Sequence, residues 1–249
     1  MRETLEFSGH TIEIRRRRYQ TRLGVSVYPN GKIGVSANKT LSQKAILKFL
    51  LSKEAWIHSS LEEVEKFREK YPPKKFLPGE VYPYLGEEYL LDFAQDKSFK
   101  IQFMENKLCL SFPKDPMTLS QKERERYFQI LKKSYKEVAK KLIGQRVEFY
   151  SEKMKLYPKS VGFRSQKSIW GSCSPENKIS LNCKLIVAPL GVIDYVVVHE
   201  LAHIKHKNHS KRFWALVDKY VNTREMSKKW LGENHYRADF LSPQSELWS

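Results

Sequence analysis

One short segment constrains the fold of this chain more than any other: His199-Glu200-Leu201-Ala202-His203. An α-helix advances about 100° and 1.5 Å per residue, so histidines four positions apart lie on one face, roughly 6 Å apart along the axis. Two imidazoles placed in this way can bind one metal ion, while Glu200 reaches a water beside the ion rather than the ion itself. The segment therefore predicts a helix that carries two metal ligands and a general base.

A catalytic zinc ion has three protein ligands and one open position, so a third ligand must come from elsewhere. His206 lies about 10 Å from His199 if the helix continues, which is too far for one ion with bonds of about 2 Å. His209 can bind only if the helix stops before it. Asn208 tolerates the left-handed cap conformation and Ser210 suits the N-cap of a following helix, so we predict a turn at Asn208 and His209 as the third ligand.

The ligand type favours zinc, and we expect one Zn²⁺ per chain. Zinc lowers the pKa of a bound water to about 7, and Glu200 would take the proton of that water as it attacks a substrate. The alternative is a core helix without a metal. It is disfavoured because unpaired polar groups in a core cost several kcal/mol. The segment thus predicts a metal-dependent hydrolase.

Two parts of the chain resemble the YgjP-like metallopeptidases, relatives of the SprT-like zincins among the HExxH metal-dependent hydrolases. The first part comprises Asp194 to His203, Asn208-His209-Ser210 and Phe213-Trp214. The second comprises Gln166-Lys167-Ser168, Trp170-Gly171-Ser172-Cys173-Ser174, Ile179-Ser180-Leu181-Asn182, Leu185-Ile186 and Pro189. The resemblance covers nearly the whole chain. It implies zinc ligands at His199, His203 and His209, a catalytic Glu200 and an α+β, zincin-like catalytic domain.

Two positions depart from the family pattern. Ile169 stands where the family often has a basic residue, and Cys183 stands where an aromatic residue is common. Both departures leave the metal ligands intact and bear on the substrate, because the strand before the zinc helix commonly lines the cleft in zincins. We therefore expect Trp170 and Ser172 to contact substrate, with a place in the core as the alternative for Trp170.

Peptide bonds are the substrate class that the resemblance implies, so the leading prediction is a zinc-dependent metallopeptidase. Two alternatives stay open because 45 Lys and Arg against 28 Asp and Glu give a net charge of +17. The first is a metal-dependent hydrolase of nucleotide phosphoanhydrides. The second is a basic nucleic-acid-binding protein with a structural metal or none.

The densest basic run is Arg15-Arg16-Arg17-Arg18. Alternate residues of a strand face opposite ways, so this run does not predict a one-sided basic strip. A charge run alone does not specify a partner, and a nucleic-acid-binding face and a solvated surface remain equal alternatives.

The rest of the composition sets outer bounds. The 249 residues are 41% hydrophobic, which is enough for a substantial core. No apolar run approaches the roughly 18 residues of a membrane span, and the first residues lack a secretion signal, so we expect a cytoplasmic protein without membrane contact. Cys109, Cys173 and Cys183 are an odd number of cysteines, which argues against a disulfide framework. No feature predicts an oligomeric state.

The expected elements fall into two regions. Strands over 11–14, 25–28 and 33–36, with a hairpin turn at Asn30-Gly31, precede a helix that Thr40 and Gln43 cap and that runs to about Arg68. Short strands return over 76–113. Together these form a β-rich amino-terminal region, 1–116, with one long helix.

The catalytic domain is expected over 117–249. Its first element is a long helix that Ser120 and Glu123 cap and that ends near Tyr157. Two or three strands over 160–187 then lead to the zinc helix. The sequence shows no internal repeat.

Overall fold

The computed structural model describes residues 3–28, 31–70, 74–165 and 169–241. The chain forms two compact units, Met1–Pro73 and Lys74–Ser249. We predicted a boundary at residue 116, and the structure places it at residue 73 instead. The reason is that the strands between these positions bury Leu91, Leu108 and Leu110 in the same core as the long helix that follows them.

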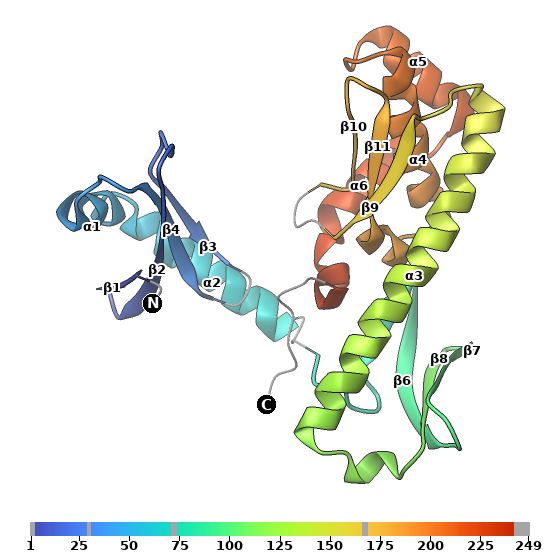
Figure 1. Cartoon of the computed structure of the whole chain (residues 1–249), viewed down its shortest axis with the longest axis horizontal. Coiled ribbons are helices and arrows are strands. Elements are labelled where there is room, and N and C mark those ends of the chain that lie inside the picture. Colours follow the sequence, from blue (N-terminus) through green and yellow to red (C-terminus); the bar gives the residue numbers. More distant parts are fainter. Residues whose placement is uncertain (1–2, 29–30, 71–73, 166–168, 242–249) are drawn as a thin grey trace. The chain divides into compact units, whose positions relative to one another are not determined.

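Unit 1 is a four-stranded sheet with helices on one face (Figure 1). Its elements are β1 (Glu3–Phe7), β2 (His10–Arg17), β3 (Gly24–Val27), β4 (Ile33–Asn38), α1 (Gln43–Leu51) and α2 (Glu54–Lys70). The strand order is β1-β2-β4-β3, with a parallel pair β2 and β4 in the centre and antiparallel strands at both edges. Alternate apolar residues of the strands form a core with Ile46 and Leu50 of α1 and Ile57 of α2.

The predictions for unit 1 hold in part. The three strands are confirmed, and β3 and β4 pair as a hairpin, although Asn30 lies outside the described residues. β1 was not predicted. The capping box at Thr40 and Gln43 is wrong, because Ser42 is the N-cap and its hydroxyl accepts a hydrogen bond from the Ala45 amide at 3.3 Å. The single helix that we predicted is interrupted between α1 and α2.

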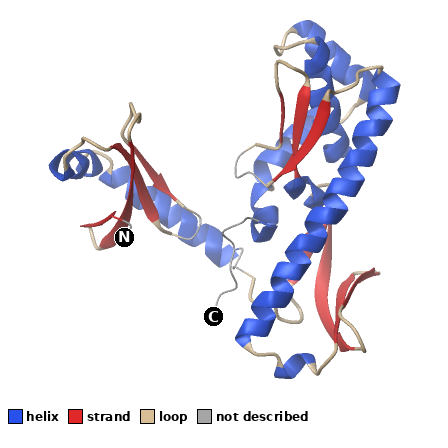
Figure 2. Ribbon diagram, in the orientation of Figure 1, coloured by secondary structure: helices blue, strands red, loops and turns tan. Residues whose placement is uncertain are grey.

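Unit 2 contains two sheets and a long helix, α3, that runs beside both of them (Figure 2). The strands are β5 (Val81–Tyr84), β6 (Glu87–Gln95), β7 (Lys100–Met104), β8 (Lys107–Phe112), β9 (Ser160–Arg164), β10 (Gly171–Cys173) and β11 (Lys178–Asn182). The helices are α3 (Gln121–Met154), α4 (Leu190–Lys205), α5 (Lys211–Tyr220) and α6 (Arg224–Glu233), with 3-10 helices η1 (Pro116–Thr118), η2 (Cys183–Val187) and η3 (His235–Leu241). The predicted α+β class is confirmed, and the helix that carries the HExxH segment packs on a small sheet.

The start of α3 is fixed as the sequence predicts. Ser120 accepts a hydrogen bond from the Glu123 amide at 3.4 Å, and the Glu123 carboxylate accepts one from the Ser120 amide at 2.9 Å. Residues at helical spacing then bury one face of α3 along the core, among them Leu131, Ala139 and Ile143. This helix connects the sheet β5-β6-β8-β7 to the sheet β10-β11-β9.

The two four-stranded sheets share one topology, although the sequence shows no repeat. In each, a parallel central pair, β2 and β4 or β6 and β8, carries one antiparallel strand at either edge. The three cysteines are free thiols. Among the described residues, no helix has the length and apolar character that crossing a membrane requires.

Candidate metal centre

Both histidines of the HExxH segment lie on α4, which is buried along most of its length. Apolar residues such as Val196 and Val197 place this helix against α3, β10, α5 and α6. The helix ends at Lys205, since His206 has an extended backbone with φ −127° and ψ 103°. The chain bends at Lys207-Asn208, as predicted, but the helix ends before Asn208 and Asn208 is not among the residues with positive φ, so the predicted left-handed cap at Asn208 is wrong.

The end of α4 brings three imidazoles together, as the sequence predicts. Nε2 of His199 lies 3.3 Å from Nε2 of His203 and 3.2 Å from Nε2 of His209. Tetrahedral zinc with bonds of about 2.0–2.1 Å holds its ligand nitrogens about 3.3 Å apart. Ser210 caps α5 and accepts a hydrogen bond from the Phe213 amide at 3.4 Å, which fixes the chain just after His209. The nitrogens therefore fit a single metal ion.

The surroundings of His199 and His203 favour the neutral imidazole, which is the form that binds a metal. Burial lowers the pKa of His199 to about 3, and the neighbouring His203 and His209 add to the effect. Burial also lowers the pKa of His203. Nδ1 of His203 lies 3.0 Å from the His206 carbonyl oxygen, so Nδ1 carries the hydrogen and donates a hydrogen bond to that oxygen. Nε2 therefore keeps its lone pair for a metal.

His209 is the most exposed of the three histidines, and stacking orients its ring. The Trp214 ring lies parallel to it, with centroids 5.4 Å apart and an interplanar angle of 20°. Nζ of Lys228 lies 4.4 Å from the centroid of the Trp214 ring. The side chain of His206 is not part of the histidine group in the described structure.

Glu200 follows His199 on α4 and is only 5% exposed. Burial raises its pKa to about 7, far from the value of an exposed carboxylate. Gly171 of β10 faces this side chain, because a Cβ at that position would lie 2.7 Å from Oε1 of Glu200. A glycine is therefore required here for the close approach of strand and carboxylate.

Two polar anchors hold the elements that carry the histidines. Arg146 of α3 donates from Nε and Nη2 to the two carboxylate oxygens of Asp194 on α4, at 2.6 and 2.8 Å. Lys207, in the loop before His209, donates to the Ser174 carbonyl at 3.2 Å and to Oδ1 of Asn177 at 2.6 Å. The first anchor ties α4 to α3, and the second ties the loop to the turn between β10 and β11.

The other predicted site residues, Trp170 and Ser172, lie before and on β10. Ser172 pairs with Ser180, and its side chain faces away from α4, whereas the neighbouring Gly171 faces Glu200. Ser172 lines a cavity of about 350 Å³ on that opposite face. Trp170 is half-buried and packs against the core. Their role as substrate contacts stays a prediction, and Gln166-Lys167-Ser168 lie outside the described residues.

The sequence did not identify Gly171, Lys207 or Trp214 as parts of the site. Gly171 did carry a signal, since an isolated glycine in a strand often marks a close approach of the backbone. The hydrogen bonds of Lys207 and the stacking of Trp214 on His209 come from the structure alone.

Three imidazoles that converge beside a buried carboxylate are typical of proteins that bind a divalent metal ion. Within this class, the chain belongs to the YgjP-like family: residues 21–234 match the family described as "YgjP-like, metallopeptidase domain". At the level of the family, it is therefore a metal-dependent hydrolase of the metallopeptidase type.

Two further comparisons add little to this result. The chain is similar to the metallopeptidase zymogen abylysin of Pyrococcus abyssi, with 21% identity over 37% of this chain and 94% of that crystal structure. The TM-score is 0.34, and we draw no conclusion from so low a similarity. None of the curated proteins matches the chain.

Proposed function

We propose that this protein is a zinc-dependent peptidase in which His199, His203 and His209 bind one Zn²⁺ and Glu200 is the general base. The observation that carries the proposal is the convergence of the three Nε2 atoms: that of His199 lies 3.3 Å from that of His203 and 3.2 Å from that of His209, beside the helix that also carries Glu200. The family match supports the reaction class. An ion in such a site supplies Lewis acidity, which polarises a carbonyl group and acidifies water.

Glu200 has the properties that a general base at neutral pH requires. Its raised pKa, about 7, lies near the pH at which the protein would work, so the carboxylate can accept a proton and release it again. In the proposed reaction Glu200 takes the proton of the attacking water and then gives it to the leaving amine. Gly171 leaves the space in which the carboxylate lies.

The test is hydrolysis of an unstructured polypeptide, such as casein, by the zinc-loaded full chain. Nucleoside triphosphates serve as the second substrate class, because the positive charge of the protein suits them. We expect cleavage of the polypeptide and a loss of at least 1,000-fold in Glu200→Gln, a loss typical of removing a group that acts in the transition state. Glu233→Gln, which changes an exposed carboxylate at the end of α6, is the matched control and should keep full activity.

Two results would overturn the proposal. One is equal polypeptide cleavage by Glu200→Gln and the wild type. The other is hydrolysis of triphosphates alone, with that activity lost in Glu200→Gln, which would assign the same site to phosphoanhydrides.

A further inference from the structure

One face of the sheet in unit 1 carries no apolar side chain in the described strands. Strand residues that face α1 and α2 are buried, such as Ile14 on β2 and Val35 on β4. The residues that alternate with them face the other way, and on β2, β3 and β4 all of these are polar or glycine. The register places Arg15 beside Ser36 and Arg17 beside Asn38, so short polar side chains of β4 lie next to the two arginines. We call this surface the open face.

Positive charge gathers at one end of the open face. Arg15 and Arg17 lie in the last part of β2, Arg18 and Arg22 lie in the loop to β3, and Lys39 follows β4. All five side chains are exposed. The loop is held at this end because Nδ2 of Asn38 donates to the carbonyls of Arg18 and Gln20, at 3.4 and 3.0 Å. We call these five cations, together with Tyr19, the basic end.

None of these five cations forms an ion pair with any residue that the structure describes. Arg16, which faces the opposite way, shows the contrast. It donates to both carboxylate oxygens of Glu3, at 2.6 and 2.9 Å, and to the Leu41 carbonyl at 2.6 Å. The open face also carries the acids Glu6 and Glu13, and Glu13 precedes Arg15 by two residues on β2, on the side of Arg15 away from the other four cations. One arginine of the run thus supports the fold, and the others are available to a ligand.

The second four-stranded sheet shows that cations without ion pairs do not follow from the strand topology. Its strands β6 and β8 pair in the same way as β2 and β4. On its outward side, Lys107 forms an ion pair with Asp92 at 2.8 Å, and Lys100 forms one with Asp96. The two cations of those strands are thus neutralised by nearby acids, whereas Arg15 and Arg17 of β2 are not.

An aromatic ring lies among the unpaired cations. Tyr19 is 86% exposed, and the guanidinium carbon of its neighbour Arg18 lies 5.9 Å from the centroid of the ring. An exposed ring among arginines matches the chemistry of single-stranded nucleic acid, in which phosphates alternate with bases that can stack. If the basic end had no ligand, burying the Tyr19 ring would be more favourable than exposing it, because burial removes apolar area from water.

We propose that the basic end binds single-stranded nucleic acid, with phosphates contacting Arg15, Arg17 and Arg22 and a base stacking on Tyr19. This inference is independent of the metal centre, which lies in the other unit. Duplex nucleic acid and anionic membranes attract the same cations, but neither offers free bases to an aromatic ring.

Fluorescence anisotropy of a labelled 20-nucleotide oligothymidylate with the full-length protein tests the proposal. We expect Arg15→Gln/Arg17→Gln to weaken binding about tenfold at about 0.1 M salt and to reduce the slope of log K against log salt by about 1.4, which is two single-strand phosphate contacts. The control Lys100→Gln/Lys107→Gln removes the same charge from the sheet of equal topology. It should stay within about twofold of the wild type.

A second pair of variants tests the ring. Tyr19→Ala should weaken binding at least about fivefold. Tyr157→Ala removes another exposed aromatic residue, from unit 2, and should change little. The proposal is overturned by equal losses in a variant and its control, by tighter binding of a duplex of the same length, or by no binding of the oligonucleotide at about 0.1 M salt. The proposal is also overturned if Arg15→Gln/Arg17→Gln weakens binding to phosphatidylserine vesicles but leaves oligonucleotide binding unchanged. That result would assign the surface to membranes.

Discussion

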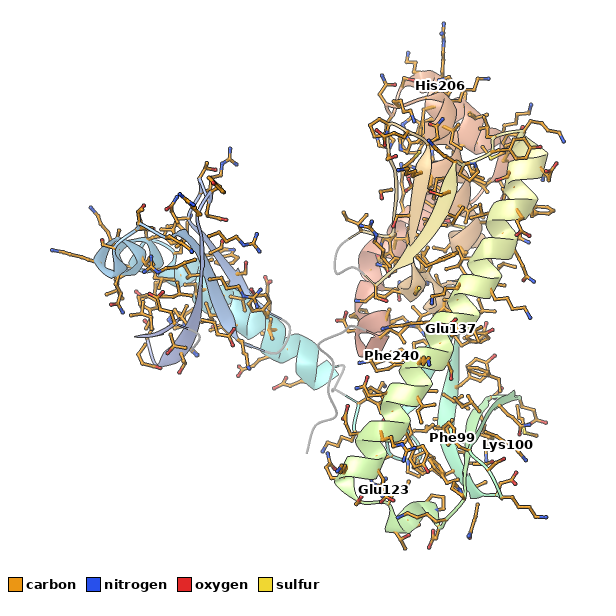
Figure 3. The ribbon with its side chains drawn as sticks, viewed as in Figure 1. Phe99, Lys100, Glu123, Glu137, His206 and Phe240 are labelled. Carbon is orange, nitrogen blue, oxygen red and sulfur yellow. The ribbon has the colours of Figure 1, made fainter. Side chains whose placement is uncertain are left out.

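The two ends of unit 2 hold glutamates whose pKa values are shifted in opposite directions. Burial raises the pKa of Glu200, beside the histidines, to about 7. At the start of α3, an ion pair with Lys114 and hydrogen bonds with Ser120 lower the pKa of Glu123 to about 2. Figure 3 labels Glu123 at one end of the unit and His206 near the other. The difference shows that burial at the histidine end disfavours the charged carboxylate, while the far end stabilises its carboxylate and uses it to fix a helix.

The largest effect should follow from adding one methyl group at the metal end. Gly171→Ala places a Cβ within 2.7 Å of the Glu200 carboxylate, so that side chain must move. We expect polypeptide hydrolysis to fall about 100-fold while zinc is retained, since small misplacements of a reacting group have effects of this size. Gly162→Ala, on β9 at the other edge of the same sheet, places its Cβ 3.9 Å from the Ile179 carbonyl oxygen, an ordinary contact, and should keep activity within about twofold. Equal activity in the two variants would contradict the close approach of Gly171 and Glu200.

The next effect concerns the ion pair that ties α4 to α3. Asp194→Ala leaves Arg146 without its two charged hydrogen bonds, and the Asp194 side chain is only 13% exposed. We expect the free energy of unfolding to fall by about 2 kcal/mol in urea titrations. Asp218→Ala breaks a more exposed pair with Arg224 and should cost about 0.5 kcal/mol or less. If both variants lose the same stability, the buried pair has no special role in holding α4.

A smaller effect should come from the loop that carries His209. Lys207→Ala removes the hydrogen bonds to Ser174 and Asn177, and the loop then holds His209 less firmly. Groups that orient metal ligands typically contribute tenfold or more to affinity, so we expect zinc affinity to fall about tenfold in competition with a chelator. Lys211→Ala removes a nearby exposed lysine of α5 as a control. Unchanged zinc affinity in Lys207→Ala would show that stacking on Trp214 is enough to place His209.

The smallest effect belongs to the far end and appears only in acid. The pKa of Glu123 in the folded protein, about 2, is below its ordinary value of 4.5. Its contribution to stability is therefore fully present above pH 4.5 and is lost as the pH falls towards 2. In Glu123→Gln the decline in stability between these values should be shallower than in the wild type, as measured by thermal melts. Glu148→Gln, an exposed change farther along α3, should keep the acid profile of the wild type. An identical profile in Glu123→Gln and the wild type would contradict the lowered pKa.

The sequence predicted the parts of the site that depend on local geometry. His199, Glu200 and His203 follow from the helical period alone, and His209 follows from the need for a third ligand together with the cap at Ser210. The exact end of α4 did not follow, because the backbone at His206 extends without a glycine or asparagine to mark the turn.

Contacts between distant segments could not be predicted in this way. Gly171 meets Glu200 only after β10 has packed on α4, and no spacing in the sequence encodes that contact. The unit boundary failed for the same reason: strands β5 to β8 share a core with α3, and only the packing reveals it. Strand alternation predicted that Arg16 faces the opposite way from Arg15 and Arg17. Whether Arg15 and Arg17 form ion pairs depends on which acids lie nearby, and only the structure shows that.

Metal content, measured by elemental analysis of the purified full chain and two histidine variants, tests the three-histidine site most directly. We expect about one zinc ion per wild-type chain, loss of the ion in His209→Ala, and retention in His206→Ala, because only the backbone carbonyl of His206 contacts His203. Absence of zinc after it is added back without chelators, or equal zinc in His209→Ala and the wild type, would contradict the proposed site.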